Sequence, residues 1–250
     1  GNIIKLIEKD DMPKYLLFLE NAFPYMDNYN YHKGMKGIIQ ELKVLLKTKS
    51  IGTNSDRALL LDFQATLETK PEKAIKLEKD ALAQIENITA DNARLVSNLH
   101  ANLGGLYRMN AHPDLAREHM EKSISLLDQF NLLHINDSIP QIANYAMFLT
   151  EQQEPERGIS ELQKLSGIIK EYHSDECLDY AKVQETLGTI YLMTANLPQA
   201  KTHFKRAFKI YEKIWADEPE MIEAKYQEIQ ELYPQIGFFI GKNLSGLLTK

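Results

Sequence analysis

The chain has little cysteine, no long apolar run and no signal peptide. Its single cysteine, Cys177, has no partner for an internal disulfide, so we expect a reducing compartment. No apolar stretch approaches the roughly 20 residues that cross a bilayer, and the N-terminus lacks the charged, apolar and cleavage regions of a signal peptide. These absences predict a cytoplasmic protein without membrane contact. The first residue is Gly1 rather than methionine, which suggests a processed tag or a piece cut from a longer chain.

The balance of charge argues against a nucleic-acid partner. The formal net charge is −6, and the 29 lysines and arginines are spread along the sequence rather than gathered in one run. The electrostatic footprint of a nucleic-acid binder is therefore missing. Apolar residues make up 44% and charged residues 26% of the chain, which is typical of a folded protein with a proper core.

The alternation of apolar and polar residues that marks a strand is also missing, and apolar residues recur at helical spacing instead. This pattern predicts an all-α fold. One helix is expected from Met12 to Tyr25, with Pro24 as its breaker, and another over 38–47. Together they form an N-terminal helical pair within residues 1–53. Four helix–turn–helix units are expected over 54–216, and capping helices over 217–250.

A set of large, small and turn-forming residues repeats through the middle of the chain. Between Val96 and Leu127 the set is Leu103, Gly104, Tyr107, Pro113, Ala116, Met120 and Ser123. Shifted by 42 residues it becomes Tyr145, Ala146, Leu149, Pro155, Gly158, Leu162 and Leu165; by a further 42, Leu187, Gly188, Tyr191, Leu197, Ala200, Phe204 and Ala207; and back by 42, Leu61, Asp62, Ala65, Pro71, Ala74, Glu78 and Ala81. A fixed period of this length is typical of a solenoid of stacked units.

The combination of leucine, glycine, tyrosine, alanine and a large apolar residue, at Leu103 to Met120 and again at Leu187 to Phe204, resembles the consensus of the tetratricopeptide repeat. The spacing of 42 is similar to that of the long repeats of kinesin light chain, whose first helix often carries asparagine just before the hydrophobic and small pair, as Asn102 and Asn144 do here. The resemblance covers about Asn54 to Trp215. It implies a right-handed superhelix of antiparallel helix pairs with the first helices along its concave side.

The resemblance also implies where a ligand binds, because first-helix residues outside the packing set face the concave groove. These are Asn98, Asn102, Gly105 and Arg108 in the second repeat, Gln141, Asn144, Met147 and Phe148 in the third, and Lys182, Glu185, Thr186 and Thr189 in the fourth. The two asparagines can hold the backbone of an extended peptide, since their amides both donate and accept. Arg108 and Lys182 can meet carboxylates. The alternative is that the asparagines only bridge neighbouring first helices.

Candidate catalytic and metal residues are few. The segment GFFIGKN, from Gly237 to Asn243, has one residue too few between its glycines for a phosphate-binding loop. Four possible metal ligands share one connector, where a solvated loop is the simpler interpretation: His173, Asp175, Glu176 and Cys177. We therefore predict that the chain is not an enzyme and has no cofactor and no metal site.

The predicted function is a non-enzymatic scaffold that binds a protein or peptide segment in the concave groove. The alternative is the C-terminal sensor or regulatory region of a larger signal-transduction ATPase or transcription regulator, in which similar long-period arrays occur. The apolar C-terminal tail, with Phe238, Phe239 and Ile240, is expected to fold back as a cap. It can also serve as a docking surface or pair two copies into a homodimer.

Overall fold

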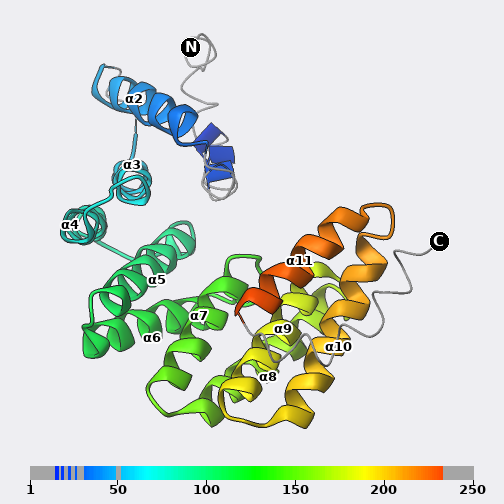
Figure 1. The fold of residues 1–250 in the computed structure, drawn as a ribbon. Helices are drawn as coiled ribbons and strands as arrows, with labels where there is room; N and C mark the ends of the chain where they lie inside the picture. The colour runs from blue at the N-terminus through cyan, green and yellow to red at the C-terminus, as the bar shows by residue number, and fades with distance from the viewer. Residues whose placement is uncertain are drawn as a thin grey trace. The chain divides into compact units, whose positions relative to one another are not determined.

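The computed structural model describes residues 15–16, 18–19, 22–23, 26, 31–48 and 52–232. This part of the chain is helical and contains no strand, so the all-α prediction is confirmed. Figure 1 labels its main helices, which are α2 (His32–Thr48), α3 (Asn54–Thr66), α4 (Pro71–Leu82), α5 (Ala93–Met109), α6 (Pro113–Gln129), α7 (Ser138–Glu151), α8 (Pro155–Tyr172), α9 (Leu178–Met193), α10 (Leu197–Ile214) and α11 (Pro219–Leu232). The segment GFFIGKN and the apolar tail lie outside the described residues, so the predictions for them stay predictions.

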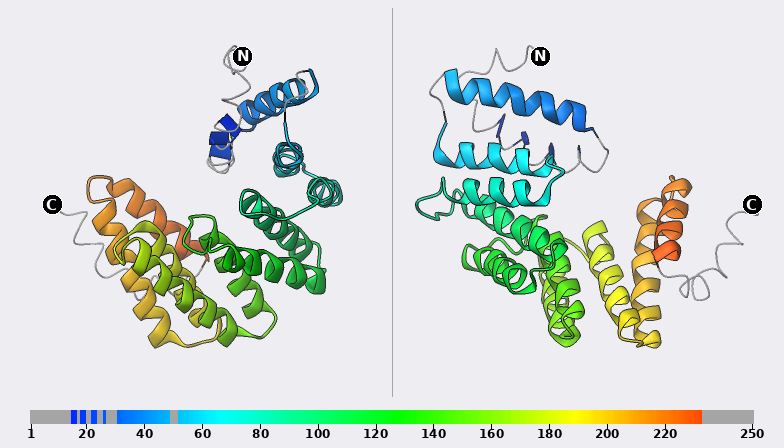
Figure 2. Two further views of the ribbon diagram at one scale, coloured as in Figure 1. Left: turned by 180° about the vertical axis from the view of Figure 1, so that it is seen from behind. Right: turned by 60° about the vertical axis from the view of Figure 1, so that its left-hand side comes forward.

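The chain divides into two compact units, an N-terminal unit of residues 1–132 and a C-terminal unit of residues 133–250. In the N-terminal unit α3 pairs with α4 and α5 with α6, while α2 lies against α3 and α4 against α5. Figure 2 shows α2, α3 and α4 as successive layers of this unit. In the C-terminal unit α7 pairs with α8 and α9 with α10, and both α7 and α8 contact α9. These four helix pairs carry the four copies of the repeated residue set.

The first three pairs turn at the proline of the repeated set. The second helices α4, α6 and α8 begin at Pro71, Pro113 and Pro155, where a missing N–H costs no helical hydrogen bond. In the last three repeats the residue two positions before the second helix has a positive φ: 56° at Ala111, 64° at Gln153 and 59° at Ala195. The next residue then donates its N–H back to the end of the first helix, as His112 does to the carbonyl of Tyr107. This turn is a Schellman-type helix end.

Small residues of the set mark the places where paired helices touch. A Cβ on Gly104 would lie 2.6 Å from Met120 Cγ, and one on Gly188 would lie 2.9 Å from the ring of Phe204. In the third repeat the close approach is made from the second helix, because a Cβ on Gly158 would lie 2.6 Å from the carbonyl oxygen of Ala146. Helix contact at this distance excludes any side chain larger than hydrogen.

The N-cap of helix α3 lies one residue earlier than the sequence indicates. The turn residues Asn54, Ser55 and Asp56 are the cap candidates by composition, yet Thr53 holds the position. Thr53 Oγ1 accepts the N–H of Asp56 at 3.2 Å, and the Asp56 carboxylate accepts the N–H of Thr53 at 2.6 Å. This reciprocal capping box places the start of α3.

Candidate functional site

Asn102, the first predicted groove asparagine, contacts two carboxyl groups of the preceding helix pair. It lies on α5, and its side-chain Nδ2 is 2.8 Å from Asp62 Oδ1 on α3 and 3.2 Å from Glu78 Oε1 on α4. The amide therefore bridges one repeat to the next. This is the alternative role predicted for the asparagines, although the Asn102 side chain also remains solvent-exposed.

The two carboxyl groups beneath Asn102 form an acid pair of a buried Glu78 and a half-buried Asp62. Glu78 is only 2% exposed. Burial, together with the nearby Asp62, raises the pKa of Glu78 from 4.5 to about 10, so Glu78 keeps its proton at neutral pH. A proton on Glu78 lets it donate to Asp62. Oε2 of Glu78 is the only buried side-chain nitrogen or oxygen atom in the described residues that has no hydrogen-bond partner.

Asn144 has a different environment from its repeat equivalent Asn102. It is exposed on α7, and no hydrogen bond from it to a neighbouring helix is found in the described part of the chain. Met147, one turn later on the same helix, is half-buried. Gln141 and Phe148 are buried, at 9% and 1% exposure, and contribute mainly to the interior.

The four predicted α9 residues differ in exposure, and only Lys182 is fully exposed. Lys182 is exposed and lies 3.7 Å from Asp179, and Thr186 is half-buried with its hydroxyl donating to the carbonyl of Lys182. Thr189 is buried. Glu185 is engaged within the protein: it accepts from the hydroxyl of Tyr211 on α10 at 2.6 Å and pairs with Lys225 on α11 at 3.0 Å.

The Glu185 contacts fasten α11 to the end of the C-terminal unit. Burial, together with the carboxylate of Glu185, raises the pKa of Tyr211 above its ordinary value, so this hydroxyl stays a donor. Tyr226 of α11 stacks on Phe208 of α10, with ring centroids 4.1 Å apart. Glu185 therefore acts as a structural anchor for the terminal helix.

The predicted residues fall into two groups. Asn98, Asn102, Gly105 and Arg108 lie on α5 in the N-terminal unit, and both Asn98 and Arg108 are half-buried and already interact within the protein. The third- and fourth-repeat residues lie on α7 and α9, which are neighbours in the C-terminal unit. Asn144 and Met147 on α7, with Lys182 and Thr186 on α9, thus lie on neighbouring first helices, and this set is named the α7–α9 face here.

The connector that offers possible metal ligands uses each of them otherwise. The His173 ring nitrogen Nε2 lies 3.0 Å from the carbonyl oxygen of His134. Asp175 pairs with Lys170 and Arg206, and Glu176 pairs with Lys213. Cys177 caps α9. Among the described residues, no group of three or more histidine, cysteine, aspartate or glutamate side chains is placed to hold a metal ion.

Four lysines that are far apart in the sequence meet in one groove of the N-terminal unit, which sequence inspection missed. Lys36 and Lys43 come from α2, and Lys73 and Lys76 from α4. The signal in the sequence was their spacing of seven and three residues, which places each pair on one helix face.

None of the described helices is long and apolar enough to span a membrane.

Comparison with known proteins agrees with the repeat geometry. The tetratricopeptide repeat family model matches residues 138–213. No curated protein sequence matches the chain significantly. Among solved structures, BtubC (BKLC) from P. vanneervenii is similar, with 17% identity and a TM-score of 0.54, over 80% of this chain and 74% of that one.

Two further structures share the fold. TPR-like repeats of a candidate kinesin light chain from Podosopora anserina have 13% identity and a TM-score of 0.57, over 78% of this chain and 96% of that one. MamA has 16% identity and a TM-score of 0.50, over 75% of this chain and 94% of that one. Residues 138–213 therefore match the tetratricopeptide repeat family, and the described part of the chain has a fold similar to that of the kinesin-light-chain repeats.

Proposed function

We propose that the chain is a protein-interaction scaffold that binds an extended segment of a partner protein on the α7–α9 face. The fold supports a scaffold in general, since tetratricopeptide repeats commonly bind other proteins. The observation that carries the specific proposal is Asn144, an exposed first-helix amide with no hydrogen bond to a neighbouring helix within the described residues. Its amide offers both a donor and an acceptor to a peptide backbone.

The surroundings of Asn144 add selectivity. Met147 offers a flexible apolar contact one helical turn away, since methionine adapts its shape to what it meets. Lys182 on the neighbouring α9 is exposed, so it can attract a carboxylate of the bound segment. The sensor region of a larger regulator, the alternative prediction, is not favoured by any of these observations.

The test begins with peptides selected on the wild-type chain from a random library. Asn144→Ala removes the proposed backbone contact, and we expect it to weaken the selected peptides about tenfold, as for loss of about one buried hydrogen-bond pair. Gln163→Ala is the matched control, because Gln163 is exposed on the second helix α8. Fluorescence anisotropy gives the affinities. Recovery of no peptide, or equal weakening by both variants, would overturn the proposal.

A further inference from the structure

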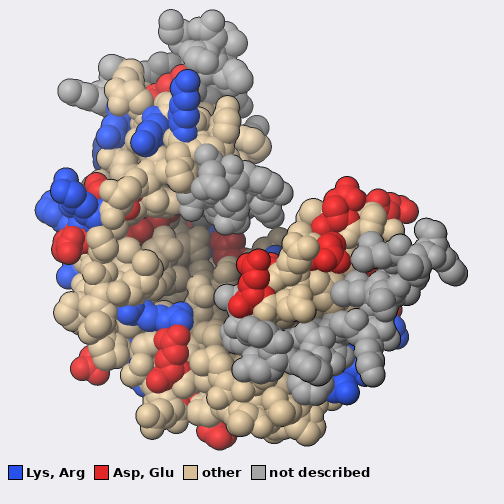
Figure 3. Space-filling model, in the orientation of Figure 1, with Lys and Arg blue, Asp and Glu red and all other residues tan. Residues whose placement is uncertain are grey.

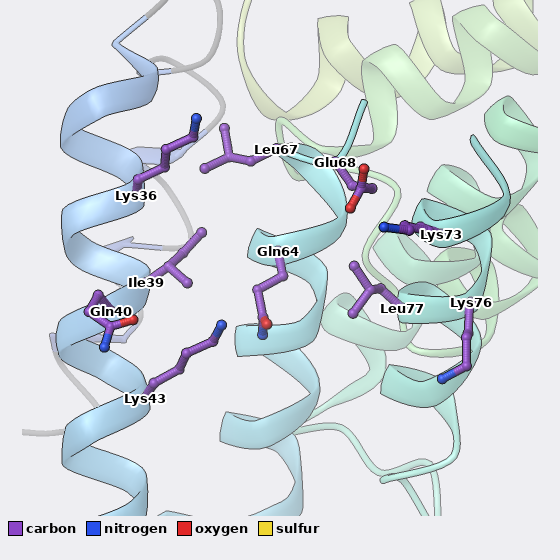
Figure 4. A pocket seen from close by; sticks show the side chains of 10 residues that line it. All are labelled: Lys36, Ile39, Gln40, Lys43, Gln64, Leu67, Glu68, Lys73, Lys76 and Leu77. Atoms are coloured by element: carbon purple, nitrogen blue, oxygen red, sulfur yellow. The ribbon is translucent and has the colours of Figure 1, made fainter. Parts of the chain in front are cut away.

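A groove in the N-terminal unit lies between α2, the C-terminal end of α3, and α4. It is open to solvent, with a volume of about 670 Å³, which lies within the range of ligand clefts. Figure 4 shows the side chains that line it: Lys36, Ile39, Gln40, Lys43, Gln64, Leu67, Glu68, Lys73, Lys76 and Leu77. Three aliphatic residues, four lysines and one glutamate therefore share one cavity.

The lining follows from helix periodicity. On α2 the two lysines stand seven residues apart with Ile39 between them, so they flank an apolar side chain on one face. Figure 4 shows Lys36 and Lys43 on either side of Ile39. On α4, Lys73 and Leu77 are one turn apart and face the same cavity from the other side. The result is an aliphatic floor with cationic walls.

The lysines of the groove are available to an anion. Within the described part of the chain no ion pair involves Lys36, Lys43 or Lys73. Lys76 pairs with Asp80 at 2.9 Å, but both side chains are exposed, at 77% and 47%, so the pair is weak. The only acidic lining residue, Glu68, accepts the backbone N–H of Lys70 before α4. Lys and Arg side chains gather over α2 and α4 in Figure 3.

We propose that this groove binds an acidic segment of a partner protein. Glutamate or aspartate side chains of the segment meet the four lysines, and its aliphatic side chains cover Ile39, Leu67 and Leu77. Charge complementarity with the lysines favours a ligand of negative charge. The aliphatic residues at the base of the groove favour a peptide with apolar side chains. The groove has no aromatic residue for base stacking and no arginine, the features that favour a single-stranded nucleic acid.

This site is independent of the α7–α9 face. None of the residues of that face lines the groove, which belongs to the N-terminal unit alone. Failure of one proposal leaves the other standing, because their variants and probe peptides differ.

The test measures binding of the full chain to a labelled short peptide of alternating glutamate and leucine. We expect Lys36→Glu/Lys43→Glu to weaken binding by about tenfold or more at low salt, because two attractive contacts become repulsive. Lys205→Glu/Lys209→Glu makes the same change in net charge at exposed lysines of α10, outside the N-terminal unit, and it should weaken binding much less than the groove variant does. Circular dichroism verifies that both variants fold.

Two further probes separate the chemistry. A peptide with glutamine in place of glutamate tests the charge, and one with serine in place of leucine tests the floor. Both should bind more weakly than the parent peptide. Equal binding of the glutamine peptide, equal loss in the two protein variants, or binding of a single-stranded oligonucleotide in preference to the acidic peptide would overturn the proposal.

Discussion

Asp62 and Glu78 stand where the second repeat has Gly104 and Met120. In the other pairs a small residue makes room for a large apolar one, and here two carboxyl groups fill the same contact. Both positions differ together, which is the expected behaviour of residues that touch. A buried and a half-buried carboxylate cannot both ionise cheaply at close range, so Glu78, the more buried of the two, retains a proton. The first repeat therefore has a polar, pH-sensitive contact where the others have an apolar one.

The double variant Asp62→Gly/Glu78→Met, which copies the second repeat, should stabilise the N-terminal unit by about 1–4 kcal/mol at pH 8. The folded pKa of Glu78 is raised from 4.5 to about 10, so the folded state binds the proton more tightly. The contribution of this carboxyl pair to stability is then highest below about pH 4.5 and falls as pH rises toward 10. Urea unfolding at pH 5 and pH 8 measures the difference, which should be larger at pH 8. An equal gain at both pH values would contradict the shared proton.

His100 gives a pH effect of the opposite sign. Its Nδ1 lies 2.9 Å from Nδ1 of His119, and burial, with His119 and Lys122 nearby, lowers its pKa from 6.5 to about 4. The unfolded chain then binds more protons, so stability falls as pH decreases from 6.5 toward 4. His100→Gln copies Gln184, which bonds His203 at 2.9 Å in the fourth repeat.

We expect His100→Gln to flatten the loss of stability between pH 6.5 and pH 4. The change should amount to about 1–2 kcal/mol, less than the full shift implies, because the pair is partly exposed to solvent. Urea titrations across this range give the slope. His112→Gln is the control, since His112 is exposed. An unchanged slope in His100→Gln, or an equal change in the control, would count against the histidine pair as its source.

At the scale of the element, the helix turns carry strain that glycine relieves. Ala111, Gln153 and Ala195 occupy the same repeat position, and each has a positive φ. A left-handed conformation costs about 1–2 kcal/mol for a residue with a Cβ. Ala111→Gly and Ala195→Gly should each stabilise the chain by about 0.5–1 kcal/mol after the entropy of glycine is allowed for. Ala224→Gly, in the exposed face of α11, should destabilise it by a similar amount, and thermal unfolding distinguishes the three variants.

Two glycines of α8 should respond oppositely to alanine. A Cβ on Gly158 would lie 2.6 Å from the backbone oxygen of Ala146, which has no flexible end to move, so Gly158→Ala should cost about 1–3 kcal/mol. A Cβ on Gly167 would meet nothing within 4 Å, so Gly167→Ala should stabilise by about 1 kcal/mol through helix propensity. Denaturant unfolding measures both. A neutral Gly158→Ala would mean that α7 and α8 approach less closely.

The helices were predictable because their signals are local. Pro71, Pro113 and Pro155 mark the starts of three second helices, and the 42-residue register places the rest. The cap of α3 at Thr53 depends on side-chain hydrogen bonds with Asp56, which spacing does not reveal. The positive φ at Gln153 was equally hidden, because glycine is the usual residue there.

At the scale of the molecule, the candidate sites depend on contacts between residues distant in sequence. Family resemblance placed Asn102 and Asn144 on first helices, but their different environments follow from Asp62 and Glu78, some 40 and 24 residues before Asn102. The lysine groove forms only when α2 packs against α3. It could not be predicted from the sequence, because its lysines do not form one basic run. The single array of four repeats and the role of the apolar tail remain predictions.

Cooperativity of unfolding tests whether the four repeats act as one array. Repeats couple only to their neighbours, and the described chain forms two compact units. We therefore expect the units to unfold separately, with different midpoints. Trp215, the single tryptophan, stacks on Tyr211 at 4.9 Å and reports only on the C-terminal unit.

In urea, the stabilising Asp62→Gly/Glu78→Met change should shift the circular dichroism transition of the N-terminal unit and leave the Trp215 fluorescence transition where it was. Gly158→Ala should do the reverse, because α8 belongs to the C-terminal unit. If both signals move together in both variants, neighbouring repeats are coupled across residues 132 and 133 strongly enough to unfold as one. The continuous array that the unbroken 42-residue register predicts would then be the unit of stability, rather than its two halves.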